Sequence, residues 1–237
     1  MSFPMGGASL DYYLILGEAG GGDPLGRAEG IAVEEFVFAA DHTAAGVDGA
    51  GWTAADGGWW SSAAFTRAMR SDPRLRARIV PAARRDAESV YRRLGGGDLP
   101  GEAGLRGRFL DRQPLAGSAP LDLGAGEVPD GFHDRRVYRI LFAGDPGAGR
   151  LPYLLGVWGM TPAGDPSGRL VGRAGRRTGD DLFGWELRRI GPGVAWCVDV
   201  TACLAGPSGD AVGPLLRELT AAMRHAGLIP VTIERFT

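Results

Sequence analysis

The stretch that decides the fold reads LFGWELRRIGPGVAWCVDVTACLAGPSGDAVGPLLRELTAAMRHAGLIPVTIERF over residues 182–236. Its beginning, 182–190, alternates apolar with small or polar side chains, the period of two that predicts a strand with one buried face. The Gly-Pro-Gly at 191–193 breaks this pattern. The run 194–204 that follows is almost continuously apolar, which is typical of a central strand covered on both sides. The two strands are therefore predicted to form a hairpin.

A helix and a last strand complete this stretch. Apolar side chains recur at the three-and-four spacing of a helix with one apolar stripe, at Val212, Leu215, Leu216, Leu219, Ala222 and Met223. Gly227 suits the left-handed residue that follows a helix. Residues 228–236 alternate again, and Pro230 has no amide hydrogen to donate to a neighbouring strand. That residue predicts a strand at the edge of the sheet.

Further strands are predicted upstream, over 137–142, 151–160 and 169–175. Their short connections favour neighbouring antiparallel strands, so together with the hairpin they form a meander of about five strands. Strands grouped in sequence and followed by a helix argue against a doubly wound sheet. We therefore predict an α+β fold, with a mainly antiparallel C-terminal sheet that carries one long amphipathic helix and is preceded by a smaller α+β unit.

The smaller unit is predicted from the N-terminal part of the chain. Strands are expected over 10–16, 31–38 and 75–80, and a helix over 63–70. A second helix is expected to begin at Pro81, because proline is well tolerated at the first helical position. This helix ends before the glycine-rich segment that follows it.

The predicted domain organisation rests on a long stretch without periodicity. Residues 95–127 are rich in Gly, Pro, Ala and Leu and are longer than most connections within a domain. We expect a small α+β unit over 1–95, a linker or long loop over 96–120, and an antiparallel-sheet α+β domain over 121–237.

Composition excludes several kinds of chemistry. All 26 basic residues are arginine, and the chain contains no lysine and no asparagine. An arginine-rich, lysine-free chain with abundant Gly, Ala and Pro indicates a GC-rich genome, and we expect a bacterial protein. A Schiff-base or phosphate-loop lysine is excluded. With 3 histidines and 2 cysteines, the chain offers too few ligands for the usual zinc sites, so we expect no metal and no cofactor.

Charge and hydropathy point to a soluble, cytoplasmic protein. The formal net charge of -2 makes general nucleic-acid binding unlikely, and no apolar run is long enough to span a membrane. The N-terminus lacks the features of a signal peptide. Cys197 and Cys203 lie on one predicted strand about 20 Å apart, too far for a disulfide, and are expected to be buried thiols.

One candidate catalytic group precedes the strand at 137–142. His133 stands beside a carboxylate and two guanidiniums, Arg135 and Arg136. Arginine binds phosphate or carboxylate through paired donors, so these residues could clamp an anionic substrate while His133 acts as acid or base. The alternative is a polar loop at the entry to the second domain.

Asp199 is the second candidate, because it places a carboxylate in the middle of a strand predicted to be buried. An unpaired buried charge is costly, so Asp199 must be paired, exposed or protonated. We predict that its face of the strand looks into a polar cleft, with Arg188 or Arg189 close to the carboxylate. A structural ion pair and a ligand-binding site remain the two alternatives.

A partner-binding surface is the third candidate, and it rests on tryptophans and divided charge. The residues 11–56 sum to -8, whereas 67–93 sum to +6. The acidic strands and basic helices either balance each other or leave a positive face for an acidic partner. The residues assigned to such a surface are Trp52, Trp59, Trp60, Arg74, Arg84 and Arg85.

No motif in the chain is specific enough to name a reaction. The first hypothesis is an intracellular, non-catalytic interaction or accessory protein that binds a protein or acidic partner and could self-associate. The alternative is an enzyme that acts on a small anionic metabolite through a site of histidine, arginine and aspartate.

Overall fold

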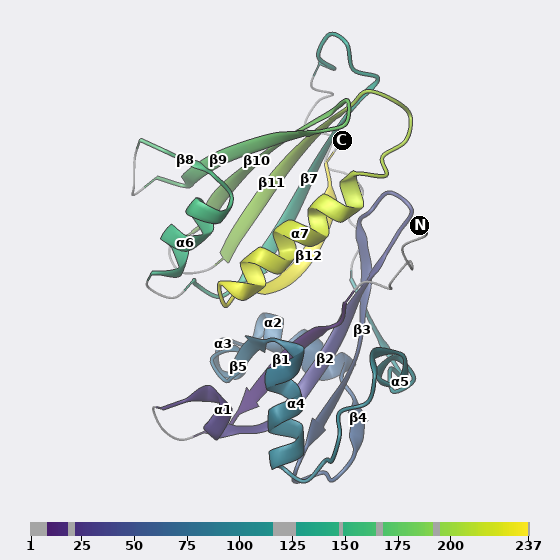
Figure 1. Ribbon diagram of the computed structural model, residues 1–237, viewed down its shortest axis with the longest axis vertical. Coiled ribbons are helices and arrows are strands. Elements are labelled where there is room, and N and C mark those ends of the chain that lie inside the picture. The colour runs from purple at the N-terminus through teal and green to yellow at the C-terminus, as the bar shows by residue number, and fades with distance from the viewer. Residues whose placement is uncertain are drawn as a thin grey trace. The chain divides into compact units, whose positions relative to one another are not determined.

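The computed structural model describes residues 9–18, 22–115, 127–146, 149–164, 168–191 and 195–236 (Figure 1). The chain divides into two compact units. The first unit is Met1–Val37 with Ala45–Leu115, and the second is Phe38–Ala44 with Ala116–Thr237. Each unit contains one antiparallel sheet with helices, so the predicted α+β class is confirmed.

The first unit is built on a six-stranded sheet. Its strands run in the order β4-β3-β2-β1-β5, and β6 pairs with β3 beside β4. They are β1 (Asp11–Leu16), β2 (Ala28–Phe38), β3 (Ala44–Thr53), β4 (Trp59–Ser61), β5 (Ile79–Ala82) and β6 (Arg112–Pro114).

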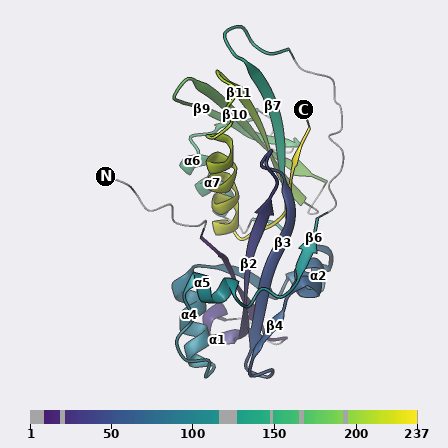
Figure 2. The same ribbon diagram turned by 90° about the vertical axis from the view of Figure 1, so that its right-hand side faces the viewer.

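Helices cover both faces of this sheet. Figure 2 shows α4 and α5 on one face and α2 on the other. The helices of the unit are α1 (Pro24–Arg27), α2 (Ala63–Ser71), α3 (Pro73–Arg76), α4 (Arg84–Arg93) and α5 (Glu102–Arg106). Neighbouring residues of a strand point to opposite faces of the sheet. In β2, Val33 therefore packs in the core that includes residues of α4, whereas Glu34 contacts Arg70 of α2.

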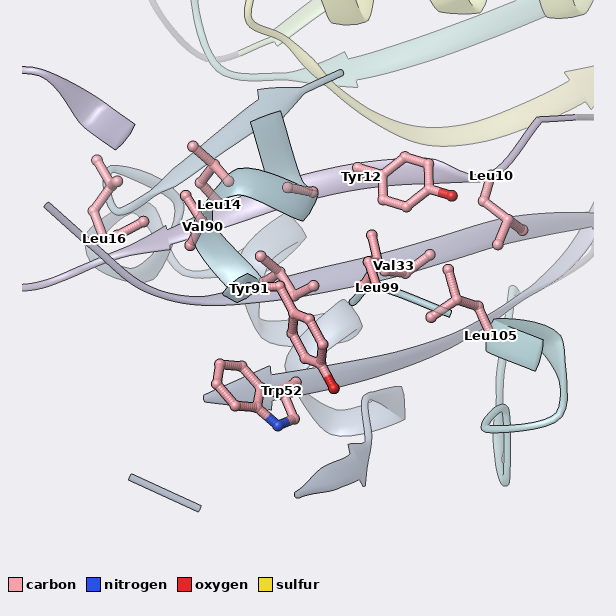
Figure 3. Close-up of a cluster of buried hydrophobic side chains, with 13 residues drawn as sticks. Leu10, Tyr12, Leu14, Leu16, Val33, Trp52, Val90, Tyr91, Leu99 and Leu105 are labelled. Carbon is pink, nitrogen blue, oxygen red and sulfur yellow. The ribbon is translucent and has the colours of Figure 1, made fainter. Parts of the chain in front are cut away.

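The core of the first unit lies between β1, β2 and α4 (Figure 3). Tyr91 of α4 packs edge-on against Trp52 of β3, with ring centroids 4.6 Å apart. Burial of such aromatic rings supplies a large share of the hydrophobic stabilisation. The other buried members are Leu10, Tyr12, Leu14, Leu16, Ala28, Ile31, Val33, Ala87, Val90, Leu99 and Leu105.

A buried ion pair joins the other face of the sheet to α2. Arg70 Nη2 donates to Glu34 Oε2 at 2.8 Å and Arg70 Nη1 to Glu34 Oε1 at 3.2 Å. The two side chains are only 6% and 2% exposed, and Thr66 donates a further hydrogen bond to the carboxylate. Burial alone would lower the pKa of Arg70, but the charge and hydrogen bonds of Glu34 raise it. Arg70 is therefore a permanent cation in the core.

Several predicted elements of the first unit are corrected by the structure. Strands β3 and β4 were not predicted, because Gly and Ala dominate residues 44–51 and carry little strand propensity. Gly51 is required there, since a Cβ would lie 2.2 Å from the ring of Trp60 on the paired strand. Pro81 lies in β5, and the helix predicted to start there begins at Arg84.

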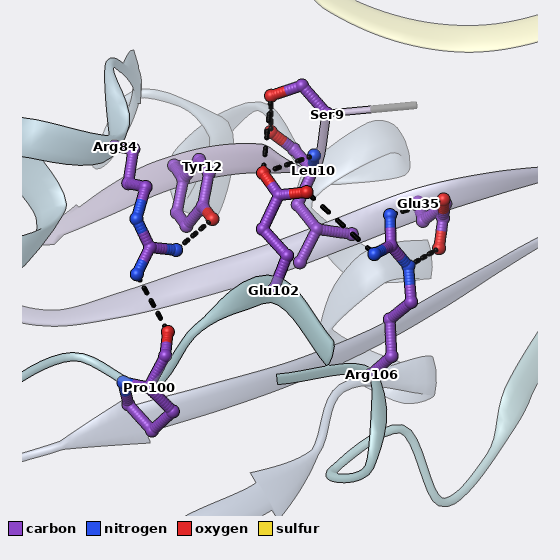
Figure 4. Close-up of polar contacts among 8 residues, drawn as sticks. All are labelled: Ser9, Leu10, Tyr12, Glu35, Arg84, Pro100, Glu102 and Arg106. Atoms are coloured by element: carbon purple, nitrogen blue, oxygen red, sulfur yellow. Dashed lines mark hydrogen bonds and ion pairs between the residues drawn. The ribbon is translucent and has the colours of Figure 1, made fainter. Parts of the chain in front are cut away.

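The first part of the predicted linker belongs to the first unit. Residues 99–114 carry α5 and β6, and Leu99 and Leu105 lie in the core. Figure 4 shows how polar contacts hold this segment. Arg84 Nη2 donates to the Pro100 carbonyl at 2.8 Å, and Arg106 forms two hydrogen bonds, 2.7 and 2.9 Å, with Glu35 of β2. These contacts are non-local, so the sequence pattern did not reveal them.

The second unit is built on another six-stranded sheet, in the order β12-β7-β11-β10-β9-β8. The predicted hairpin is confirmed: β10 and β11 are antiparallel over their whole length, although the turn at 192–194 lies outside the described residues. Its strands are β7 (Asp134–Ala143), β8 (Thr161–Pro162), β9 (Leu170–Thr178), β10 (Asp181–Ile190), β11 (Ala195–Leu204) and β12 (Ile229–Arg235).

The predicted helix is confirmed as α7 (Val212–His225), and it buries the predicted apolar stripe on one face of the sheet. Gly227 follows it with a φ of 97°, the left-handed conformation that glycine adopts most easily. The predicted edge position of the last strand is also confirmed, since β12 ends the sheet.

The strand predicted over 151–160 is wrong. Residues Arg150–Val157 form α6, which buries Leu154 and precedes the short β8. A continuous apolar run of this length does not distinguish a buried strand from a buried helix. The strand β7 also does not begin a meander, because it does not pair with the strands that follow it directly in the sequence, β8 and β9. It lies between β11 and β12, and pairs with both.

Two other expectations can be compared with the structure. Both Cys197 and Cys203 are buried and form no disulfide, as predicted. Among the residues that the structure describes, no helix is both long and apolar enough to cross a membrane.

Candidate functional site

The candidate site lies on the sheet of the second unit, on the face opposite α6 and α7 (Figure 2). Apolar side chains of β10 and β11, such as Trp185 and Val198, point to the helix side. The residues between them point to the other face, which carries no helix among the described residues of this unit. Strand alternation therefore places the polar residues of the sheet together.

Register brings five charges into one row across this face. Arg173 of β9 pairs with Glu186 of β10, Glu186 with Asp199 of β11, and Asp199 with Arg139 of β7. Arg139 in turn pairs with Glu234 of β12. Directly opposed residues lie about 4.5–5.5 Å apart, so the three inner charges, Glu186, Asp199 and Arg139, each have a charged neighbour on both sides.

Asp199 is held by an arginine from each neighbouring strand. Arg139 Nε and Nη2 donate to its two carboxylate oxygens at 2.6 and 2.9 Å. Arg188 Nε lies 3.4 Å from Asp199 Oδ2. The prediction that Arg188 or Arg189 lies close to this carboxylate is confirmed for Arg188, whereas Arg189 stacks on the ring of Trp196 at 5.2 Å. The hydrogen bonds that Arg139 donates to Asp199 raise the pKa of Arg139 above its usual value.

Glu186 holds the next two arginines. Its carboxylate accepts a hydrogen bond of 2.6 Å from Arg173 Nε and two from Arg188. Burial pushes the pKa of Glu186 upward, but these hydrogen bonds outweigh it and the pKa is lowered. The carboxylates therefore fix the orientation of the guanidiniums that surround them.

A pocket of about 280 Å³ opens beside this row, where Arg188 pairs with Cys197 across the hairpin. Four of the residues that line it are arginines, and the remainder are apolar or small. The lining residues are Arg139, Arg169, Arg188, Arg189, Ile190, Gly191 and Cys197. Side chains from β7, β10 and β11 therefore converge with Arg169, which directly precedes β9.

The pocket carries excess positive charge. Arg139 and Arg188 pair with the carboxylates of Asp199 and Glu186, so Arg169 adds one positive charge in excess. Arg189 lies over the ring of Trp196, whose indole nitrogen donates to Asp145. Adding the outer pair Arg173 and Glu234 leaves the balance unchanged. The exposed side chain of Arg169 forms no hydrogen bond or ion pair with any residue that the structure describes. Its donors are available to a ligand.

Cys197 lines the pocket and is only 1% exposed. Burial, followed by the nearby charge of Asp199, raises the pKa of this thiol from 9.0 to about 11. The thiolate is the nucleophilic form of cysteine, so Cys197 is a neutral and unreactive group at physiological pH. It adds no negative charge that would repel an anion.

The predicted histidine group does not assemble at this pocket. His133 is exposed, and none of the chain's histidines lines the pocket. Arg136 Nε donates to Asp134 Oδ2 at 2.7 Å. Burial pushes the pKa of Arg136 down, but its hydrogen bonds with Asp134 and Tyr138 outweigh this and the pKa is raised. Arg135 is opposite Cys203 in the sheet. Asp199 is thus the only predicted catalytic or substrate-binding residue beside the pocket.

The predicted partner surface is largely used within the first unit. Trp52 is 4% exposed, and Trp59 packs against Tyr91 with ring centroids 5.7 Å apart. Trp60 packs edge-on against Phe65. These three side chains therefore belong to the packing of the unit and do not form an exposed cluster.

The arginines predicted for this surface differ in role. Arg84 donates to the Tyr12 hydroxyl at 2.6 Å and to two backbone carbonyls. Arg74 and Arg85 are exposed. Elsewhere in the unit, Arg70 pairs with Glu34, and Arg78 pairs with Glu18 and Glu29. These pairs join the basic segment 67–93 to the acidic segment 11–56, which supports the alternative that the two charges balance each other.

Sequence reasoning missed Arg139 and Arg169 as site residues. The only signal was Asp199, whose charge required a partner somewhere in the sheet. The partner Arg139 is 60 residues away and became a neighbour only because β7 pairs with β11.

Comparison with known proteins adds no assignment. No protein-family model matches this chain, and no curated protein matches its sequence.

Proposed function

We propose that the protein is a non-catalytic binding protein whose second unit binds the anionic group of an acidic ligand or partner in the arginine pocket. The observation that carries the proposal is a pocket lined by four arginines, at which the Arg169 guanidinium has no partner among the described residues. Guanidinium groups bind carboxylate and phosphate groups through paired hydrogen bonds.

Two features support binding without catalysis. The buried Cys197 thiol is neutral at physiological pH, and no histidine lines the pocket, so a nucleophile and a general base are both missing from its described lining. The exposed position of His133 gives no support to the alternative of an enzyme that uses this histidine. We further propose a cytoplasmic location, which agrees with two buried thiols that form no disulfide.

Anion titration followed by NMR tests this function. We expect citrate or sulfate to shift the Nε–H resonances of Arg139 and Arg188, because both side chains line the pocket. In Arg169→Gln, which removes the guanidinium that has no partner among the described residues, affinity should fall about tenfold, the worth of one charge-assisted hydrogen bond.

The matched control for this titration is Arg217→Gln. It removes one exposed positive charge from α7, on the opposite face of the same sheet. We expect unchanged affinity for this variant. If no anion shifts the pocket resonances, or if both variants weaken binding equally, the pocket is not the binding site.

A further inference from the structure

The arginines of the pocket differ in how many of their donors are already engaged. Arg139 and Arg188 each use Nε and Nη2 on the carboxylates of Asp199 and Glu186. A guanidinium has five N–H donors, so Nη1 of each of these arginines stays available to a ligand. The carboxylates also fix the planes of both guanidiniums before a ligand binds.

Arg169 is the least engaged arginine of the pocket. Its exposed guanidinium forms no hydrogen bond or ion pair with a residue that the structure describes. The forked donors of a guanidinium match the two coplanar oxygens of a carboxylate, which accept two parallel hydrogen bonds. Arg169 can therefore bind a carboxylate through both of its oxygens.

The charge of the pocket favours a ligand with a single negative charge. Asp199 and Glu186 balance Arg139 and Arg188, so only the charge of Arg169 is in excess. Arg189 is engaged over the ring of Trp196. A monoanion neutralises the excess, whereas a second negative charge on the ligand would be repelled by the neighbouring carboxylates.

The size and the apolar lining of the pocket restrict the rest of the ligand. The volume of about 280 Å³ lies just below the range of roughly 300–1,000 Å³ for ligand pockets, so only a few carbon atoms fit beside the charged group. Ile190, which is 37% exposed, lines the pocket together with Gly191 and the neutral thiol of Cys197. A short alkyl chain against Ile190 would remove apolar surface from water on both molecules.

We infer that the arginine pocket of the second unit binds a small monocarboxylic acid with a short aliphatic chain. The carboxylate accepts paired hydrogen bonds from Arg169, and the aliphatic chain lies against Ile190. This inference rests on the proposed function and names the ligand class of the same pocket.

An NMR titration with three probes of equal chain length tests the charge requirement. Butyrate is a monoanion, butyramide is its neutral counterpart of the same shape, and succinate carries a second carboxylate at its other end. We expect butyrate to bind about tenfold or more tightly than butyramide, because the amide lacks the charge-assisted hydrogen bonds. Butyrate should also bind at least as tightly as succinate. Equal affinity for butyramide, or tighter binding of succinate, would overturn the inference.

Two substitutions of Arg169 test the paired contact. Arg169→Gln removes the charge, and Arg169→Lys keeps the charge but replaces the forked donors by a single ammonium group. We expect butyrate affinity to fall about tenfold in Arg169→Gln and about threefold or more in Arg169→Lys. Arg217→Gln on α7 is the control and should bind butyrate normally. Full affinity in either variant of Arg169 would contradict the carboxylate contact.

Ile190→Ala tests the aliphatic part of the ligand. The unmodified protein should bind butyrate about threefold or more tightly than acetate, because the longer chain buries more apolar surface. In Ile190→Ala this preference should disappear while the affinity for acetate stays the same, which shows that the pocket is intact. Equal affinity of the unmodified protein for acetate and butyrate would overturn the assignment of an aliphatic chain.

A carboxylate with an aliphatic neighbour also occurs at the C-terminus of a peptide. Isovalerate and an acetylated tripeptide that ends in valine carry the same branched chain next to a carboxylate and separate these two sources. Tighter binding of the peptide would overturn the assignment to a small free acid. Binding of sulfate or citrate without binding of any monocarboxylate would overturn the inference and leave the proposed function intact. Failure of all these anions would overturn the proposed function itself.

Discussion

The two units of this protein use arginine in different ways. In the first unit, Arg70 is buried against Glu34, and Arg84 and Arg106 hold the segment 99–106 against the sheet. In the second unit, Arg139 and Arg188 lie on the face of the sheet opposite α6 and α7 and are about 40% exposed. They are also paired, yet the pocket beside them retains an excess of positive charge.

The difference follows from what covers each sheet. Helices lie on both faces of the first sheet. A charged side chain that is buried under a helix costs free energy of folding unless it has a partner inside the unit. The sheet of the second unit has helices on only one face among its described residues, so charges on the other face stay partly hydrated. Arginine thus stabilises the first unit and remains available to a ligand in the second.

The largest expected effect comes from the buried pair. Replacing Glu34 with glutamine keeps the size of the side chain but removes the anionic partner of Arg70. We expect a loss of about 3–5 kcal/mol in the free energy of unfolding, the usual cost of breaking a buried ion pair. Urea unfolding measures this change.

Two controls sharpen that measurement. Asp48→Asn breaks a bidentate pair with the exposed Arg112 on the same sheet, and should leave stability nearly unchanged. The double substitution Glu34→Gln and Arg70→Met removes both charges and should recover part of the loss. If Glu34→Gln is as harmless as Asp48→Asn, the first unit does not depend on its buried charges.

A smaller effect is expected from Arg84→Met, which keeps the aliphatic part of the side chain. The variant loses the hydrogen bonds to the Tyr12 hydroxyl and to the carbonyls of Leu99 and Pro100. We expect a loss of about 2 kcal/mol, because these acceptors lose a charged donor. The neighbouring Arg85→Met, whose side chain is 88% exposed, is the control and should show no change. Equal stability of both variants would show that Arg84 does not anchor this segment.

The smallest effect is expected from Asp199→Asn in the second unit. Because Arg139 is 38% exposed, water compensates for the lost pair, and we expect a loss of only about 1 kcal/mol, or roughly 2–4 °C in Tm. The substitution also removes a negative charge beside the pocket, so affinity for sulfate should stay within about threefold or rise. An unchanged Tm combined with lost affinity would make Asp199 itself a ligand-binding residue, and the two units would then differ less than we infer.

Local periodicity predicted the elements whose patterns are complete within one segment. The strand β10, the helix α7 and the edge strand β12 each have an apolar period that fits one structure. The strand β11 has no such period, and it was predicted as a continuous apolar run that follows a turn signal. The run 151–160 lacks such a period, and it forms α6 because that helix can bury Leu154. The glycine-rich β3 was missed because its pairing with β4 and β6, and not its own side chains, makes it a strand.

The candidate site was predictable only in part, for a related reason. A carboxylate in a buried strand requires a partner, and this rule alone indicated Asp199 and an arginine across the hairpin. It gave no information about Arg139 or Arg169, which the sequence places 60 and 30 residues from Asp199.

The sequence by itself determined the α+β class, the C-terminal hairpin and helix, the absence of lysine chemistry and the need for a partner at Asp199. These follow from local period, side-chain chemistry and the cost of a buried charge. Only the tertiary structure decided that β7 lies between β11 and β12, which brings Arg139 to Asp199 and four arginines to one pocket. Strand order depends on contacts between segments that are distant in the sequence, so the pattern of one segment alone cannot predict it.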